Sequence, residues 1–164
     1  APNIIKRLIK GETLALISDA GTPVFADPGQ HLLGLLYKSG IPISPIPGPS
    51  SLMTALSLVD FPIDQFRFAG FPPQKNDLRE GFLSKFAHEN IPVILMDTPY
   101  RLTRLLEDVQ TVYGKDQPIL LACDLTLKNE VIFRGSVCDI LPQVSGQKRE
   151  FILILAPNQT KKEK

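Results

Sequence analysis

The chain has 164 residues, 43% of them hydrophobic and 21% charged, so it can bury a core and is neither disordered nor fibrous. Its 18 basic and 17 acidic residues leave a formal charge of +1, which argues against bulk electrostatic capture of nucleic acid but allows a local basic patch. No apolar run approaches the roughly 18 residues of a membrane span. Two cysteines are too few for a disulfide framework, so we expect a protein of the reducing cytoplasm.

The first 58 residues alternate between helical and strand-like patterns. Three segments have the apolar spacing of helices: residues 2–10, 30–39 and 52–58. Two short apolar runs have the composition of buried parallel strands: residues 13–17 and 41–46. Pro42 and Pro45 lack the backbone donors of a sheet ladder, so the second of these strands should be short or irregular.

A linker at residues 60–64 precedes a second α/β pattern. Its predicted strands are residues 65–71, 92–96, 119–123, 130–134 and 151–156. Its predicted helices begin at Asn76, which we expect to cap the first of them, at Thr98-Pro99 and near Val137. The chain therefore divides into an N-terminal α/β lobe, a C-terminal α/β lobe and a flexible tail, with the bounds 1–62, 65–158 and 159–164.

Two turns of the first lobe have the composition of a ligand site. Residues 18–29 contain two glycines, two prolines and two aspartates, and residues 47–51 read Pro-Gly-Pro-Ser-Ser. Both turns leave the carboxyl ends of predicted strands, where an open parallel sheet binds its ligands. Small residues let backbone groups approach a ligand. Asp19 and Asp27 could orient ligand hydroxyls or could equally be ordinary turn and cap residues.

Several familiar catalytic signatures are missing from the sequence. It has no phosphate-binding P-loop motif, no Gly-x-Gly-x-x-Gly after a strand and no Gly-x-Ser-x-Gly nucleophile elbow. His31 and His88 have no cysteine or histidine at ligand spacing, so we expect no metal.

Five segments stand in the order of motifs of a known family. They are residues 16–23 (LISDAGTP), 26–29 (ADPG), 46–51 (IPGPSS), 68–73 (FAGFPP) and 98–102 (TPYRL). Together they resemble the tetrapyrrole-methylase superfamily, most closely the branch that methylates the 2′-oxygen of a cytidine in 16S rRNA. The resemblance implies the two-lobed α/β fold of the class III methyltransferases, S-adenosylmethionine as cofactor and methyl donor, and a homodimer.

Two departures from the family pattern bear on these expectations. The family usually begins with a further strand and a Pro-Ile-Gly-Asn-Leu-type loop, which do not precede Ala1, so we expect an incomplete N-terminal lobe and a fragment or truncated product. The rRNA branch commonly has Ser-Pro-His-Arg and Arg-Glu-Leu-Thr segments. This chain has TPYR at residues 98–101 and CDLT at residues 123–126, which resemble a paralogous group of the same family.

The resemblance implies that the cofactor pocket draws on the two turns and on one later strand. Its expected residues are Ser18, Asp19, Ala20, Gly21, Thr22, Asp27, Pro47, Gly48, Ser50, Ser51 and Met96. Transfer to a ribose hydroxyl also needs a general base or a water relay. The candidate catalytic residues are Asp19, Asp97, Arg101 and Asp124.

Basic residues of the second lobe are candidates for substrate binding. They are Lys75, Arg79, Arg101 and Lys128, with Lys85 and Arg134 as further members of an RNA-facing set. Arg101 begins a helix, where the dipole favours anions, so it has either a phosphate or carboxylate of the substrate as partner or an ordinary salt bridge to Asp97 or Asp124.

Three functions remain open on the sequence alone. The first is an S-adenosylmethionine-dependent methyltransferase acting on an rRNA ribose. The second keeps the methyl donor but has a tetrapyrrole or another small molecule as acceptor. The third is a catalytically incomplete binding or dimerisation module.

Overall fold

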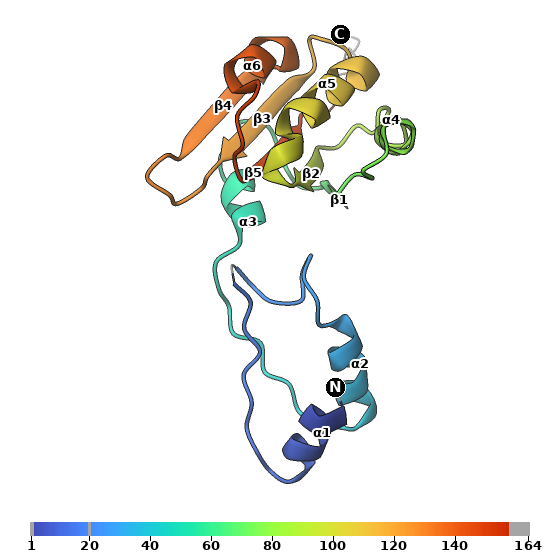
Figure 1. Ribbon diagram of the computed structural model, residues 1–164, viewed down its shortest axis with the longest axis vertical. Coiled ribbons are helices and arrows are strands. Elements are labelled where there is room, and N and C mark those ends of the chain that lie inside the picture. Colours follow the sequence, from blue (N-terminus) through green and yellow to red (C-terminus); the bar gives the residue numbers. More distant parts are fainter. Residues whose placement is uncertain (1, 20, 158–164) are drawn as a thin grey trace. The chain divides into compact units, whose positions relative to one another are not determined.

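The computed structural model describes residues 2–19 and 21–157. Its contacts divide the chain into two compact units, Ala1–Ser50 and Ser51–Lys164, and each unit is described by itself (Figure 1). The division lies before residues 60–64, where we expected the linker, because the helix that follows Ser50 packs on the sheet of the second unit. Ala20 and the expected tail, residues 159–164, lie outside the described residues.

The described residues of the first unit form two helices and long irregular segments. Helix α1 spans Pro2–Ile9 and helix α2 spans Gln30–Lys38, as the apolar spacing predicts. No strand forms within residues 2–19 and 21–50, so the prediction of buried strands at residues 13–17 and 41–46 is wrong for this structure. Leu16 and Ile17 are 47% and 83% exposed, which shows that the apolar run is not covered as an inner strand would be. A strand needs a hydrogen-bonding neighbour, and Pro42 and Pro45 cannot donate to one.

The second unit is built on a five-stranded mixed sheet, and all five of its predicted strands are confirmed. The strands are β1 (Arg67–Gly70), β2 (Val93–Asp97), β3 (Pro118–Cys123), β4 (Val131–Ser136) and β5 (Phe151–Leu155). Their order across the sheet is β1-β2-β5-β3-β4. Strand β1 pairs with β2 in parallel, and the other three pairings are antiparallel. The carboxyl ends of β1, β2 and β3 therefore share one edge of the sheet with the amino ends of β4 and β5.

Helices cover both faces of this sheet (Figure 1). They are α3 (Ser51–Leu56), α4 (Asn76–Ser84), α5 (Leu102–Tyr113) and α6 (Val137–Val144), and a 3-10 turn, η1 (Pro99–Arg101), precedes α5. Side chains alternate between the faces because successive residues of a strand point in opposite directions. Val93 and Leu95 pack with α4, α5 and α6, whereas Ile94 packs with Leu52 of α3. The larger core lies on the α5 side.

Candidate functional site

The two small-residue turns of the first unit lie against each other. The hydroxyl of Thr22 donates a hydrogen bond to the carbonyl oxygen of Pro49 at 3.3 Å. A Cβ added at Gly21 would lie 3.4 Å from that same oxygen, and one added at Gly48 would lie 3.8 Å from the Thr22 hydroxyl. Two turns that are 27 residues apart in sequence thus meet through a side chain and a backbone carbonyl, as we expected for the walls of one pocket.

The longer turn holds a strained backbone. Val24 and Ala26 have positive φ values of 76° and 56°, which are rare for residues with a side chain and a clear outlier for a β-branched one. Gly29 has a φ of 147°, and a Cβ there would lie only 2.8 Å from Cγ2 of Val24. Such strain persists only where the surroundings enforce it, and it gathers at ligand sites.

Polar groups of this turn face solvent or close the turn itself. The hydroxyl of Ser18 donates to the carbonyl of Gly21 at 3.0 Å, while Asp19 and Asp27 are exposed. Exposed carboxylates beside bare backbone can accept hydrogen bonds from the hydroxyls of a ribose. In the short turn, Pro47 and Gly48 are exposed and Ser50 is half-buried.

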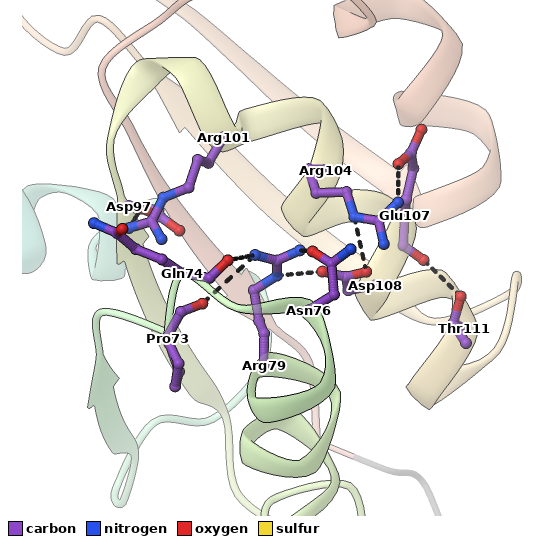
Figure 2. Close-up of polar contacts among 10 residues, drawn as sticks. All are labelled: Pro73, Gln74, Asn76, Arg79, Asp97, Arg101, Arg104, Glu107, Asp108 and Thr111. Carbon is purple, nitrogen blue, oxygen red and sulfur yellow. Dashed lines mark hydrogen bonds and ion pairs between the residues drawn. The ribbon is translucent and has the colours of Figure 1, made fainter.

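In the second unit, Asp97 and Arg101 form an ion pair at the carboxyl end of β2 (Figure 2). The side chain of Asp97 is fully buried, and its Oδ1 also accepts a hydrogen bond from the backbone N–H of Thr98 at 2.6 Å. Oδ2 of Asp97 and Nη1 of Arg101 are buried with no hydrogen-bond partner among the described residues. This is the salt bridge that the sequence left as one of two alternatives. It leaves 23% of the Arg101 side chain exposed.

Asp124 follows β3 at the same edge and is engaged on both carboxylate oxygens. Oδ2 accepts hydrogen bonds from Asn129 at 2.6 Å and from Arg149 at 2.8 Å, and Oδ1 accepts one from the backbone N–H of Glu150 at 3.1 Å. The residue is 6% exposed and has a φ of 51°. Its carboxylate therefore anchors the loop after β3. Asp124 could act as a general base only if these hydrogen bonds broke.

Arg79 is the clearest correction to the expected substrate-binding set. It is 2% exposed, its Nε pairs with Asp108 of α5, and its Nη atoms donate to the carbonyl of Gln74 at 3.0 Å and to Oδ1 of Asn76 at 2.8 Å (Figure 2). A guanidinium used in this way cannot face a phosphate. The expectation that Asn76 caps α4 is also wrong, because Lys75 occupies the cap position and makes no side-chain cap bond.

The remaining candidate residues of the second unit differ in their exposure to solvent. Lys75 and Lys128 are exposed, in the segment before α4 and in the loop after β3. Ser51 begins α3 and is exposed, and Met96 packs against the cluster on the α3 face of the sheet. Arg134, by contrast, pairs with Asp60.

The sequence did not predict two arrangements of charged residues. Asp108 is a buried carboxylate on α5. In the sequence, this role could be inferred only from the presence of a charged residue beside the apolar stripe of the helix. Nζ of Lys148 lies 4.8 Å from the ring centroid of Tyr100, and no local pattern connects those two residues.

Among the described residues, neither Cys123 nor Tyr113, whose pKa values are shifted, is poised to react at neutral pH. Burial raises the pKa of the Cys123 thiol to about 11, with Arg149 lowering it and Asp124 raising it to smaller extents. Burial, and then the charge of Glu89, raise the pKa of Tyr113 to about 12. Cys123 is therefore a core residue and not a nucleophile.

A cavity of about 810 Å³ lies at the opposite edge of the sheet. It is lined by Asp60, Phe61, Pro118, Ile119, Leu120, Arg134, Gly135, Ala156 and Pro157. Of the candidate residues in the described part of the chain, Arg134 alone lines it. Among the described residues, no group of three or more His, Cys, Asp or Glu side chains could hold a metal ion. No helix in the described ranges is both long and apolar enough to cross a membrane.

Comparison with known proteins agrees with the motifs. The family model described as Tetrapyrrole (Corrin/Porphyrin) Methylases matches residues 2–141. A protein of Xylella fastidiosa named ribosomal RNA small subunit methyltransferase I is 38% identical over 94% of this chain and 58% of its own length. The protein of that name from Escherichia coli O157:H7 is 35% identical over 99% of this chain and again 58% of the relative. The chain thus spans somewhat more than half the length of these relatives.

Solved structures show the same fold at low sequence identity. The methyltransferase CobJ superposes with a TM-score of 0.69 at 18% identity, over 100% of this chain and 72% of CobJ. A uroporphyrin-III C-methyltransferase from Thermus thermophilus, solved in complex with S-adenosylhomocysteine, has a TM-score of 0.62 at 14% identity, over 94% of this chain and 70% of that one.

Proposed function

Because the chain belongs to the tetrapyrrole methylase family, we propose that it is part of an S-adenosylmethionine-dependent methyltransferase that methylates a ribose 2′-oxygen in the rRNA of the small ribosomal subunit. Relatives at 35–38% identity, whose names specify small-subunit rRNA, support this RNA as the substrate, and the family resemblance supports the ribose oxygen as the acceptor atom. The tetrapyrrole-related structures are only 14–18% identical, so they support the fold and not a tetrapyrrole acceptor.

The contact between Thr22 and Pro49 is the observation that carries the cofactor assignment. It joins two turns whose glycines have no side chain to cover the backbone. A nucleoside can therefore approach the backbone amides and carbonyls of these turns closely. Within the first unit, the residues that would hold the cofactor are Ser18, Asp19, Gly21, Thr22, Asp27, Pro47, Gly48 and Ser50. The roles of Ser51 and Met96 stay predictions.

The cofactor, when bound, supplies a methyl group on a sulfonium, which an oxygen nucleophile can attack without a metal ion or a covalent enzyme intermediate. The residues of the chain then have to orient the reactants, which can provide about 7–11 kcal/mol of the rate acceleration. Exposed Asp19 and Asp27 are suited to hold ribose hydroxyls of the cofactor. For the acceptor we propose Arg101 as a phosphate contact, held in place by Asp97.

Calorimetry and a transfer assay test this function. S-adenosylhomocysteine should bind the protein, and a radiolabelled methyl group should pass from S-adenosylmethionine to small ribosomal subunits. Arg101→Gln should weaken RNA binding while S-adenosylhomocysteine binding stays unchanged. Absence of binding at millimolar S-adenosylhomocysteine would refute the assignment of the cofactor. Binding without methylation of rRNA would refute the acceptor.

The proposal includes a homodimer in the cytoplasm, where ribosomal subunits are found. The family resemblance supports the dimer, and the pair of cysteines without a disulfide supports a reducing compartment. Sedimentation equilibrium over a range of concentrations would measure the dimer directly. A monomer at all concentrations would contradict it.

A further inference from the structure

Tyr100 and Lys148 form an exposed aromatic and cationic pair at the edge of the sheet where β1, β2 and β3 end. Tyr100 lies in η1 directly after β2, and Lys148 lies just before β5. Strands β2 and β5 are neighbours, with Asp97 opposite Phe151, so the segments that flank these residues are brought together. The Lys148 ammonium lies 4.8 Å from the ring centroid of Tyr100, within the range of a cation–π contact.

Most of the Tyr100 ring is accessible despite this contact. The residue is 76% exposed, the highest exposure after Ile17 and Ile46 among the exposed large hydrophobic residues. A ring of this kind contributes little to the fold. Its position is nevertheless defined, because η1 is tied to β2 through the ion pair of Arg101 with the buried Asp97.

The charges around Tyr100 favour an anion. The two buried acidic side chains at this edge already have cationic partners, since Asp97 pairs with Arg101 and Asp124 pairs with Arg149. Glu150, which directly precedes β5, is exposed. The carboxylate of Glu130 accepts a hydrogen bond from the backbone N–H of Thr126 at 2.6 Å. Within the described residues, Lys148 has no carboxylate as ion-pair partner, so its charge is available to a ligand.

We propose that Tyr100 and Lys148 bind one unpaired nucleotide of RNA, with the base stacked on the Tyr100 ring and the adjacent phosphate in contact with the Lys148 ammonium. Every base has an aromatic face that can stack on tyrosine, and a lysine beside the ring supplies attraction to the backbone. This inference rests on the proposed function, because it assigns residues that would position its RNA substrate. The site differs from the expected cofactor turns, which belong to the first unit.

Binding of a fluorescein-labelled single-stranded oligocytidine RNA of about ten nucleotides tests the site. Tyr100→Ala should weaken binding by about 5- to 100-fold, since stacking is lost, whereas Tyr100→Phe should bind within about twofold of the unmodified protein because the ring is kept. Lys148→Gln should weaken binding and lower the slope of log affinity against log salt by about one. Lys115→Gln is the matched control, because Lys115 is exposed at the other edge of the sheet.

The outcomes separate this inference from the proposed function. If the unmodified protein binds S-adenosylhomocysteine and methylates rRNA while Tyr100→Ala and Lys148→Gln keep full RNA affinity, the nucleotide site alone is refuted. If the unmodified protein binds no S-adenosylhomocysteine, the proposed function fails first. Should Tyr100→Ala change self-association in sedimentation and leave RNA affinity intact, the ring belongs to an interface between copies, and the nucleotide site is again refuted.

Discussion

Arg79 and Asp108 form an ion pair inside the second unit, with only 2% and 3% of their side chains exposed. The pair joins α4 to α5, and the same guanidinium donates to the carbonyl of Gln74, in the segment that follows β1. One side chain of α4 therefore holds both the distant helix α5 and the segment that leads into α4 (Figure 2).

Arg79→Met should lower the free energy of unfolding by about 3–5 kcal/mol, because it leaves the buried carboxylate of Asp108 without its main partner. Urea denaturation followed by circular dichroism would measure the change. Arg104→Met is the control, since Arg104 also pairs with Asp108, at 3.4 Å, but has 46% of its side chain exposed and should cost less than about 1 kcal/mol. Equal losses for the two variants would show that Arg79 has no special structural role.

Gly21→Ala should weaken S-adenosylhomocysteine binding by roughly tenfold, a little over 1 kcal/mol. Gly21 has a φ of 74°, and the new Cβ would lie 3.4 Å from the Pro49 carbonyl oxygen at the junction of the two turns. Gly34→Ala is the matched control, because nothing lies within 4 Å of its Cβ position in α2 and alanine favours a helix by about 0.5–1 kcal/mol. Titration calorimetry on both variants would decide. Unchanged affinity for Gly21→Ala would count against a ligand at this junction.

Only one of the two thiols should react in the folded protein near neutral pH. Burial raises the pKa of Cys123 to about 11, so almost none of it is thiolate, while Cys138 is only partly buried. A chromogenic disulfide reagent should modify Cys138 first and Cys123 only after unfolding in denaturant. Cys138→Ser should abolish the early phase. Rapid modification of both thiols without denaturant would disprove the burial of Cys123.

Tyr113 should make stability depend on pH in the alkaline range. Its pKa is raised from 10.0 to about 12 in the folded protein, where its hydroxyl donates to the carbonyl of Leu83 at 3.1 Å. Below pH 10 both states keep the proton, so this contribution is intact. Between pH 10 and 12 the unfolded state loses its proton first, so the free energy of unfolding should fall. Chemical denaturation at several pH values would show this fall, and Tyr113→Phe should reduce it.

Asp124→Asn should loosen the loop between β3 and β4. The change removes the charge that pairs with Arg149, and it should lower stability by about 1–3 kcal/mol. Hydrogen–deuterium exchange of residues 125–130 should become faster, while Asp116→Asn, an exposed site at the other edge of the sheet, should leave it unchanged. If exchange in the loop is the same in both variants, Asp124 does not anchor it.

Local patterns predicted the second unit well because its elements carry their own signals. The apolar stripe that contains Leu102, Leu105 and Val109 is fully buried in α5, and Gly114, a typical helix-ending residue, caps that helix. In the first unit the same kind of signal failed. The apolar run at residues 13–17 has the composition of a strand, but a strand also requires a hydrogen-bonding neighbour, which composition cannot reveal.

The family motifs predicted which segments of the chain form the candidate site, but not the environment of each residue. They predicted that the turns around Gly21 and Gly48 meet, and the bond from Thr22 to Pro49 confirms that they do. The sequence alone does not separate basic residues by environment, so the predicted substrate-binding set contains both Arg79, which is buried, and Lys75, which is exposed. Burial depends on which helix packs opposite a side chain, and that is not a local property.

By itself, the sequence determined where most helices and strands of the second unit begin and end, and which family the chain resembles, because periodicity and motif order are local features of the chain. Only the tertiary structure decided which charges pair and which rings stay exposed. The order β2-β5 brings Lys148 over Tyr100, and the packing of α4 on α5 encloses Arg79 with Asp108. Such partners depend on strand order and helix packing, which arise from many distant contacts at once.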